Sequence, residues 1–559
     1  MSQSVRRALI LAAGASTLLA TGPGLTSAQA SVETKFAGIN HIVVIYEENH
    51  SFDNLYGGWE GVNGRANATT LQVDQSGNAY GCILQNDVNL TSPPQPVACS
   101  GVTVKGVPYN SNFGNAPFNI GTFIPSTART CPQPGVFALH GLTPSAANLP
   151  GGCTEDIVHR FYQEQFQINN GAQNRYATGS DAAGLTLGFY DTTQLPIYKF
   201  LHADGAPHYA IADDFFQGAF GGSFLNHQWL IAAATPTWPN MPAGQHSIVD
   251  SNGFPNAGYP LYKPTAAVLN DSRGTQACGL SSTNLNVACG DFAVNTTQPA
   301  YQPFKGSPQL PPQTGKTIGD ELTAAGVSWA WYSGGWSNAD GDVGAPGWTN
   351  GDGTKGCIDP DSAANPTWPN CPNKVFQYHH QPFNYFANYA PGTPGRAHLQ
   401  DEQAFLAAAG GSGSTCQLNQ VSFIKPVGLE NEHPGYTSET RGSDHLVDLL
   451  TAINGSACRK DTMVVVTYDE FGGQYDHVAP PGQGLTKGPH DQWGPGTRVP
   501  ALILAPRLAG DFVVDNTQYD TTSILATIER RYGLTALGTR DAAVNDLSKV
   551  FNARSPFDT

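Results

Sequence analysis

Six short apolar runs, each four to six residues long, constrain the fold of this sequence more than any other feature. They are dense in valine, isoleucine and other apolar residues. Continuous apolar runs of this length are typical of parallel strands that are covered on both faces of a sheet. The runs are Ile42–Tyr46, Tyr209–Asp213, Ser328–Tyr332, Val421–Ile424, Met463–Tyr468 and Pro500–Ala505.

Helical patterns lie between these runs, at Leu195–Ala203, Ser443–Asn454 and Thr521–Tyr532, where Thr521 or Thr522 is a candidate cap and Gly533 follows the last turn. Strands that alternate with helices indicate an α/β fold. Segments rich in Gly, Pro, Asn and Cys interrupt the pattern, and they show no repeat and no linker. We therefore expect one large domain over residues 31–559, with loop insertions at about 60–150, 235–315 and 335–375.

The first thirty residues have the features of a secretory signal peptide. Two arginines come first, a mostly small and apolar stretch from Ala8 to Ala20 follows, and Ser27-Ala28-Gln29-Ala30 offers a cleavage site. An amphipathic helix of the mature fold is the alternative, but the segment has no acidic residue near its start. We therefore expect a secreted or periplasmic protein. No other stretch approaches the roughly 18 apolar residues of a membrane helix, so no integral membrane segment is expected.

The charge of the chain restricts its partners. The formal net charge is −16, and removal of the first thirty residues with Arg6 and Arg7 would bring it to about −18. Such a surface repels nucleic acid and anionic membranes, so neither is an expected partner.

Ten cysteines in an exported chain indicate disulfides. No C-x-x-C pair is present, which disfavours a zinc ribbon. Spacing alone does not prove the connectivity, and the simplest hypothesis joins neighbours in sequence. These pairs are Cys82–Cys99, Cys131–Cys153, Cys278–Cys289, Cys357–Cys371 and Cys416–Cys458.

Acidic clusters follow two of the apolar runs. Glu48 and Asn49 come after the first run, and Asp469 and Glu470 come after the fifth. Ligands of open α/β sheets bind beyond the carboxyl ends of the strands, and three carboxylates brought together there need a cation. An all-oxygen set suits a hard or borderline divalent ion. Each cluster taken singly is also compatible with a solvated turn.

A glycine-rich turn places Ser223 before another apolar stretch. Backbone N–H groups at a helix start favour an anion, although a serine in this position is often only a helix cap. The turn is not a nucleophile elbow, because Leu225 stands where G-x-S-x-G requires glycine. Histidines that could bind metal, hold phosphate or transfer protons are also present, and each could equally be a packed or surface residue. They are His159, His379, His380, His433 and His477.

These residues resemble, in order along most of the chain, the bacterial phosphoesterase family of non-specific phospholipases C and related acid phosphatases, within the alkaline-phosphatase-like superfamily. The family's E-N-x-S-F-D-x-x-G motif is similar to residues 48–53 together with Gly57, and its D-E-x-G-G-x-Y-D-H-V motif is similar to residues 469–478. The stretch 223–226 resembles its T-x-P-N, with Ser for Thr and Leu for Pro. Further landmarks are Asp156, His159, Asn170-Gly171, Leu195-Pro196, His380-Gln381-Pro382-Phe383, His433-Pro434 and Arg498-Val499-Pro500-Ala501.

The resemblance implies a mixed, mostly parallel sheet flanked by helices on both faces, with disulfide-stapled loop insertions. It also implies that one divalent metal ion, of unknown identity, is bound by Glu48, Asn49, Asp469 and Glu470 and contacts the nucleophile Ser223. In the resulting hypothesis Ser223 attacks phosphorus, and one histidine, with His433 as the candidate, protonates the leaving alcohol. The groups expected around the other phosphate oxygens are Asn226, His159, His379, His380 and His433.

The expected substrates are small phosphate esters or phospholipid head groups. The chain stops about 80 residues beyond the second motif and shows no amphipathic lipid-binding helix, which favours an acid-phosphatase-like phosphomonoesterase. A phospholipase C is the alternative, and an inactive secreted surface-binding protein is the non-enzyme alternative. No C-x-P-x-R site is present, which disfavours a sulfatase. The sequence leaves the oligomeric state open.

Overall fold

The computed structural model of the chain places the two acidic clusters and Ser223 at one edge of a large sheet. The predicted signal peptide and the predicted Cys131–Cys153 pair lie outside the described residues. The structure describes residues 35–84, 99–102, 108–111, 113–122, 125–127, 137–138, 141–142, 156–255, 258–265, 270–279, 287–410 and 415–557.

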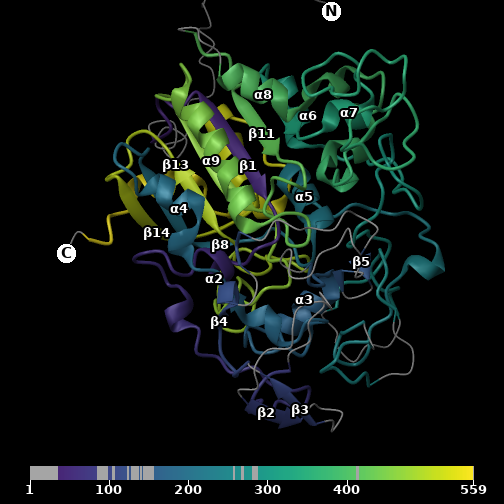
Figure 1. Cartoon of the computed structure of the whole chain (residues 1–559), viewed down its shortest axis with the longest axis vertical. Coiled ribbons are helices and arrows are strands. Elements are labelled where there is room, and N and C mark those ends of the chain that lie inside the picture. The colour runs from purple at the N-terminus through teal and green to yellow at the C-terminus, as the bar shows by residue number, and fades with distance from the viewer. Residues whose placement is uncertain are drawn as a thin grey trace, which may run out of the picture.

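An eight-stranded sheet forms the centre of the fold (Figure 1). Every pairing in it is parallel except those of β13, which runs antiparallel to both neighbours. The expected mixed, mostly parallel sheet is therefore confirmed. In spatial order the strands are β10 (Leu399–Asp401), β9 (Trp329–Ser333), β11 (Val421–Lys425), β1 (His41–Glu47), β12 (Thr462–Tyr468), β13 (Ala501–Leu504), β8 (Tyr209–Phe216) and β14 (Phe512–Asp520).

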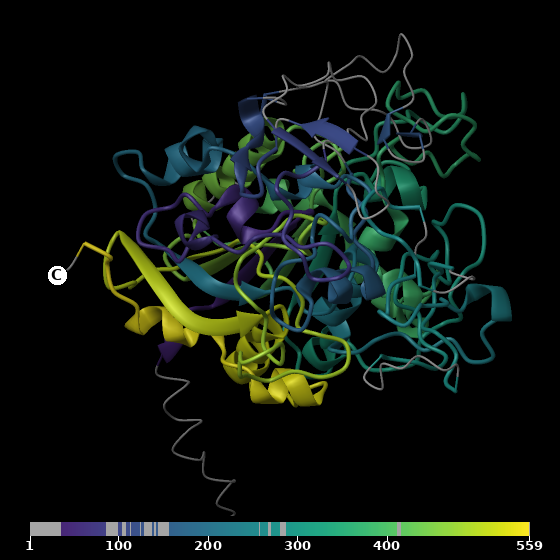
Figure 2. The same cartoon turned by 90° about the horizontal axis from the view of Figure 1, so that it is seen from below.

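All six predicted strands are present, and two further strands were not predicted. β10 has only three residues, and β14 lies at the outer edge of the sheet (Figure 2), where polar residues interrupt its apolar pattern and the register shifts between Asp515 and Gln518. The apolar pattern also did not predict the antiparallel direction of β13. A central strand is buried on both faces whichever way it runs, so its composition does not reveal its direction.

Helices cover both faces of this sheet. Adjacent side chains of a strand point to opposite faces. The Tyr46 ring of β1 packs on His227 of α5. The next residue, Glu47, instead interacts electrostatically with His445 of α9. Figure 1 shows α9 crossing the sheet beside α4 and α8. The helices are α2 (Phe52–Leu55), α3 (Phe161–Ile168), α4 (Pro196–Leu201), α5 (Ser223–Ala232), α6 (Ile318–Ala324), α7 (Trp336–Asp340), α8 (Glu402–Ala409), α9 (Glu439–Gly455), α10 (Thr522–Tyr532) and α11 (Thr539–Ala543).

The three predicted helices correspond to α4, α9 and α10. Thr521 is the N-cap residue of α10, as predicted, but its side chain makes no capping hydrogen bond, and Asp520 Oδ1 instead accepts the N–H of Thr522 at 2.6 Å. Gly533 ends α10 in the left-handed conformation, as expected. Among the helices that the structure describes, none is long and apolar enough to cross a membrane.

The described parts of the predicted insertions are mostly irregular, and three small two-stranded sheets are formed by strands in or near the first insertion. These sheets pair β2 (Cys99–Val102) with β3 (Pro108–Ser111), β4 (Phe118–Asn119) with β7 (Gly188–Phe189), and β5 (Phe137–Ala138) with β6 (Gly141–Leu142).

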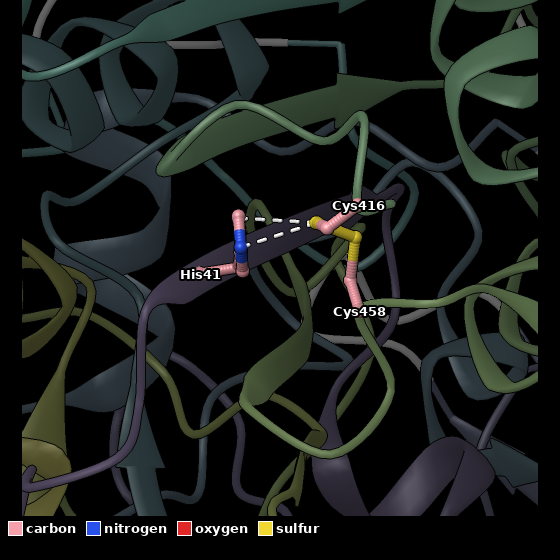
Figure 3. Close-up of side chains that lie close together, drawn as sticks. All are labelled: His41, Cys416 and Cys458. Atoms are coloured by element: carbon pink, nitrogen blue, oxygen red, sulfur yellow. Dashed lines mark hydrogen bonds between the residues drawn. A yellow bond between two sulfur atoms is a disulfide. The ribbon is translucent and has the colours of Figure 1, made fainter. Parts of the chain in front are cut away.

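Four of the predicted disulfides are confirmed, namely Cys82–Cys99, Cys278–Cys289, Cys357–Cys371 and Cys416–Cys458. The last of these joins the segment before β11 to the segment before β12. His41, the first residue of β1, lies against this bridge with its Nε2 3.2 Å from Cys416 Sγ (Figure 3). Because both sulfurs are bonded to each other, the group is a packed bridge and not a metal site. It lies at the amino end of β1, opposite the acidic edge.

Candidate active site

The candidate site begins where β1 and β12 end side by side. The two strands pair in parallel over seven residues, so Glu48 and Asp469 are the first residues beyond the same edge. The Asn49 backbone N–H donates to Asp469 Oδ1 at 3.2 Å. A Cβ on Gly472 would lie 2.1 Å from the Asn49 carbonyl oxygen, and Gly472 has φ +62°. Only glycine allows this close approach, which explains the glycine after the second acidic pair.

Ser223 reaches the same edge from β8. This strand is parallel to β1 and β12, and the turn that follows it ends at Ser223, the first residue of α5. Gln217 holds the turn together, since its Nε2 donates to the carbonyl oxygens of Ala219 at 2.7 Å and Gly221 at 3.0 Å. Gly221 has φ +91°, a conformation that glycine tolerates best.

The hydroxyl of Ser223 lies among oxygen atoms from both acidic clusters. Its Oγ is 3.1 Å from Glu48 Oε2, 3.4 Å from Asn49 Oδ1 and 3.5 Å from Glu470 Oε1. A hydroxyl has one proton to donate, so it satisfies only one of these acceptors. We call this group the oxygen cage; its members are Glu48, Asn49, Ser223, Asp469 and Glu470.

The electrostatics of the oxygen cage fit a bound cation. Burial, and then the charge of Asp469, raise the pKa of Glu48 to about 8. Burial likewise raises the pKa values of Asp469 and Glu470. Asp469 Oδ2 is fully buried and has no hydrogen-bond partner among the described residues. Three carboxylates buried together with an orphaned oxygen are costly without a positive charge, and all-oxygen ligands suit a divalent ion.

Two histidines face the oxygen cage with a lone pair. The Nδ1 atoms of His159 and His433 lie 2.5 and 2.6 Å from the carbonyl oxygens of Ile157 and Pro434, which assigns their protons to Nδ1. Their Nε2 atoms lie 3.2 and 3.1 Å from Nδ2 of Asn49. Burial lowers the pKa of His159 to about 4 and that of His433 well below its usual value. Both rings are therefore neutral and can accept a proton at Nε2.

The two adjacent histidines of the third predicted landmark take different positions. His380 is buried, with Nε2 3.0 Å from Glu48 Oε1, and its ring stacks on His227 at 5.0 Å. His379 packs edge-on against His380, with ring centroids 4.5 Å apart, and among the described residues it has no hydrogen bond to the oxygen cage. His380 thus borders the cage, whereas His379 stands one ring behind it.

Comparison with known proteins gives the family. The sequence model of the family described as "Phosphoesterase family" matches residues 39–535 of this chain. The chain belongs to this family.

Two named relatives and one solved structure are similar to this phosphoesterase. Phospholipase C A of Mycobacterium tuberculosis is 24% identical over 549 residues, which cover 93% of this chain and 78% of the relative. Non-hemolytic phospholipase C of Burkholderia pseudomallei is 23% identical, covering 97% of this chain and 64% of the relative. A Vibrio parahaemolyticus protein of the alkaline phosphatase superfamily has a TM-score of 0.28 at 12% identity, over 66% of each chain. The family and the two phospholipase C relatives make the chain a phosphoric ester hydrolase.

Asn226 contacts the turn before Ser223 in this phosphoesterase. Its Oδ1 accepts the Ala219 N–H at 2.8 Å, and its Nδ2 lies 3.1 to 3.3 Å from the carbonyl oxygens of Ala219, Gly221 and Gly222. The amide is thus engaged with this turn, and its role at the phosphate oxygens stays a prediction.

Lys425 and His227 border the oxygen cage and were not predicted. Lys425 is the last residue of β11 and is fully buried, and it forms an ion pair with Glu48. His227 lies one turn after Ser223 in α5, with Nδ1 2.8 Å from the Ser223 carbonyl and 3.7 Å from Asp469 Oδ2. The only signal for Lys425 was a charge directly after a buried apolar run, the same signal that pointed to the acidic clusters.

A buried charge network joins the two motifs behind the cage. Arg498 Nε donates to both carboxylate oxygens of Asp476, and Nη2 donates to Asp53 Oδ1 at 3.3 Å. Asp53 Oδ2 in turn accepts the backbone N–H of His477 at 3.0 Å. The acidic pair around His477 could resemble a cation site, but the guanidinium of Arg498 already supplies the positive charge. These family landmarks hold the ends of β1 and β12 together.

A cavity of about 530 Å³ opens beside the site. His159 and Gly222 belong to its wall and connect it with Ser223. Most of the remaining wall is polar or charged, and Arg160 and Asp271 form an ion pair across it at 3.3 Å. Charged residues of the wall include Asp156, Arg160, Asp271 and Arg273.

Proposed function

We propose that this hydrolase is a metal-dependent phosphomonoesterase that works through a phosphoserine intermediate on Ser223. The observation that carries the proposal is the position of Ser223 Oγ, within 3.1 to 3.5 Å of oxygen atoms of three other cage residues. A divalent ion, when bound by Glu48, Asn49, Asp469 and Glu470, would favour the alkoxide form of Ser223 and polarise a phosphoryl oxygen.

The chain's own residues supply the remaining steps. Ser223 Oγ attacks phosphorus opposite the leaving oxygen, and Glu48 Oε2, at 3.1 Å, accepts the hydrogen bond of the hydroxyl. His433, with His159 as its counterpart, presents a lone pair on Nε2 toward the same space. His433 Nε2 accepts the proton of the Ser223 hydroxyl and gives it to the leaving alkoxide; in the second step the same nitrogen takes a proton from the attacking water and passes it to Ser223 Oγ as the bond from phosphorus to Ser223 breaks. Inorganic phosphate leaves and the hydroxyl is restored.

The cavity supports a monoester as substrate. The leaving group of a phospholipid cleaved by a phospholipase C is a diacylglycerol, which needs an apolar wall. The wall beside Ser223 instead carries Asp156, Arg160, Asp271 and Arg273, which suit a polar alcohol.

Phospholipase C activity is the second candidate, because two relatives that align with over nine-tenths of this chain bear that name. Hydrolysis of p-nitrophenyl phosphate and of p-nitrophenyl phosphorylcholine, measured side by side, separates the two. We expect kcat/KM to be at least about tenfold higher for the monoester. A preference for the phosphorylcholine diester would reject the monoesterase in favour of the phospholipase. If neither compound is hydrolysed at any metal concentration, the remaining alternative is a non-enzymatic surface-binding protein.

We also propose that the protein is exported. The four described disulfides are typical of oxidising compartments. N-terminal sequencing of protein recovered from the periplasm or the medium is expected to begin at Ser31. A cell-retained protein with an intact Met1 or Ser2 would contradict export.

A further inference from the structure

Lys425 occupies an unusual position for a lysine. It ends β11, beside the end of β1, and its side chain is fully buried. Its Nζ donates to the carbonyl oxygens of Tyr46 at 2.8 Å and Glu47 at 3.1 Å, and forms an ion pair with Glu48 Oε1. All three contacts come from consecutive residues at the end of β1. The ammonium is therefore fixed on the oxygen of Glu48 that faces away from Ser223, and it leaves Oε2 directed at the serine.

The charges around the oxygen cage can be counted. Glu48, Asp469 and Glu470 bring three carboxylates. Within the part of the chain that the structure describes, Lys425 is the one lysine or arginine bonded to a residue of the cage.

With its three carboxylates ionised, the cage together with Lys425 carries two uncompensated negative charges.

We infer that Lys425 is a specificity-determining residue that sets the charge of the cation the oxygen cage accepts. It neutralises one of the three carboxylates, so that a divalent ion balances the remaining two. Without Lys425, the same oxygen atoms would match a trivalent ion. This inference rests on the metal site of the proposed function.

The test compares two hard, oxygen-seeking cations of different charge. The dissociation constants of Ca²⁺ and Tb³⁺ are measured by calorimetry on the wild-type protein and on Lys425→Met, with circular dichroism to verify folding. We expect the ratio of Tb³⁺ to Ca²⁺ affinity to rise by at least about tenfold in Lys425→Met. A merely structural role would weaken both ions alike, so an unchanged or lower ratio in a folded variant would overturn the inference.

Two further variants sharpen the test. Lys199→Met removes an exposed lysine of α4 and should leave the ratio at the wild-type value. Lys425→Met combined with Glu48→Gln removes one charge of each sign and avoids leaving the Glu48 carboxylate without its ammonium partner, so it can be measured even where the single variant does not fold. Its ratio should stay within about threefold of wild type. A ratio about tenfold below wild type would overturn the inference, because the lost charge of Glu48 would then be uncompensated.

Failure of the metal site is distinguishable from failure of the inference. Wild-type protein that binds neither ion would remove the site itself, and the inference with it. Wild-type protein that binds both ions, with the ratio unmoved by Lys425→Met, would overturn the role of Lys425 alone.

Discussion

Ser223 is the proposed nucleophile, and the proposed chemistry depends on it. Replacing Ser223 with Ala should lower kcat by about a thousandfold or more, because the nucleophile is lost, while metal content stays at the wild-type level. Steady-state kinetics and mass-spectrometric metal analysis measure the two effects. Ser422→Ala is a matched control, since Ser422 is also buried but its Oγ has no hydrogen bond in the described structure. Near wild-type hydrolysis by the Ser223→Ala protein would exclude this nucleophile.

Gly472 carries a prediction about geometry. An added Cβ would lie 2.1 Å from the Asn49 carbonyl and would sit at a positive φ. Gly472→Ala should therefore destabilise the protein by about 1 to 3 kcal/mol and reduce activity by separating the two acidic clusters. Urea denaturation and kinetics measure both effects. Gly455→Ala, where no heavy atom lies within 4 Å of the added Cβ, should leave stability and activity near wild type. Equal behaviour of the two variants would contradict the close approach.

At the residue scale, the sequence predicted the side chains that stand directly beyond a predicted strand and left out those that need a neighbouring strand or helix to be known. Glu48 and Asp469 were found because each follows an apolar run. Lys425 follows such a run too, but its role appears only when β11 lies beside β1. The engagement of Asn226 with its own turn depends on backbone geometry that no spacing reveals.

The contact between α8 and α9 makes stability depend on pH. His445 Nε2 lies 2.5 Å from Glu402 Oε1. Burial lowers the pKa of His445, but its hydrogen bond and attraction to Glu402 outweigh burial and raise the pKa to about 9. A raised folded-state pKa stabilises the protein fully below the unfolded value of 6.5, and this stabilisation is lost as pH rises through about 9.

His445→Gln should therefore cost about 1 to 3 kcal/mol of unfolding free energy near pH 6, and clearly less near pH 10. Urea denaturation at the two pH values measures the difference. His208→Gln, at an exposed histidine, is the control and should show little loss at either pH. A loss that does not shrink with rising pH would contradict the ion pair.

At the element scale, apolar density predicted the six buried strands but neither their order nor their direction. β13 is as apolar as the parallel strands of the sheet, and yet it pairs antiparallel with its neighbour β12. β14 escaped prediction because an edge strand exposes part of its length and has polar residues there. Strand order depends on long-range pairing, which local pattern does not contain.

For the whole molecule, we expect one disulfide to contribute to stability but not to catalytic activity. Cys416–Cys458 closes a separation of 42 residues at the amino end of β1, about seven strand residues from the oxygen cage. Replacing both cysteines with Ser should cost about 2 to 4 kcal/mol of stability and leave kcat of the folded enzyme unchanged. Thermal unfolding and kinetics below the transition test this. A loss of kcat in fully folded protein would show that the two edges of the sheet are coupled.

In the whole molecule, strands distant in sequence bring the proposed cation site and the proposed serine nucleophile together. Rapid acid quench during turnover of a phosphate monoester, followed by mass spectrometry of the digested chain, tests this most directly. We predict a phosphoryl group on Ser223 that disappears when a chelator removes the metal before substrate is added. Product formed in a burst while Ser223 stays unmodified at every quench time would contradict the account.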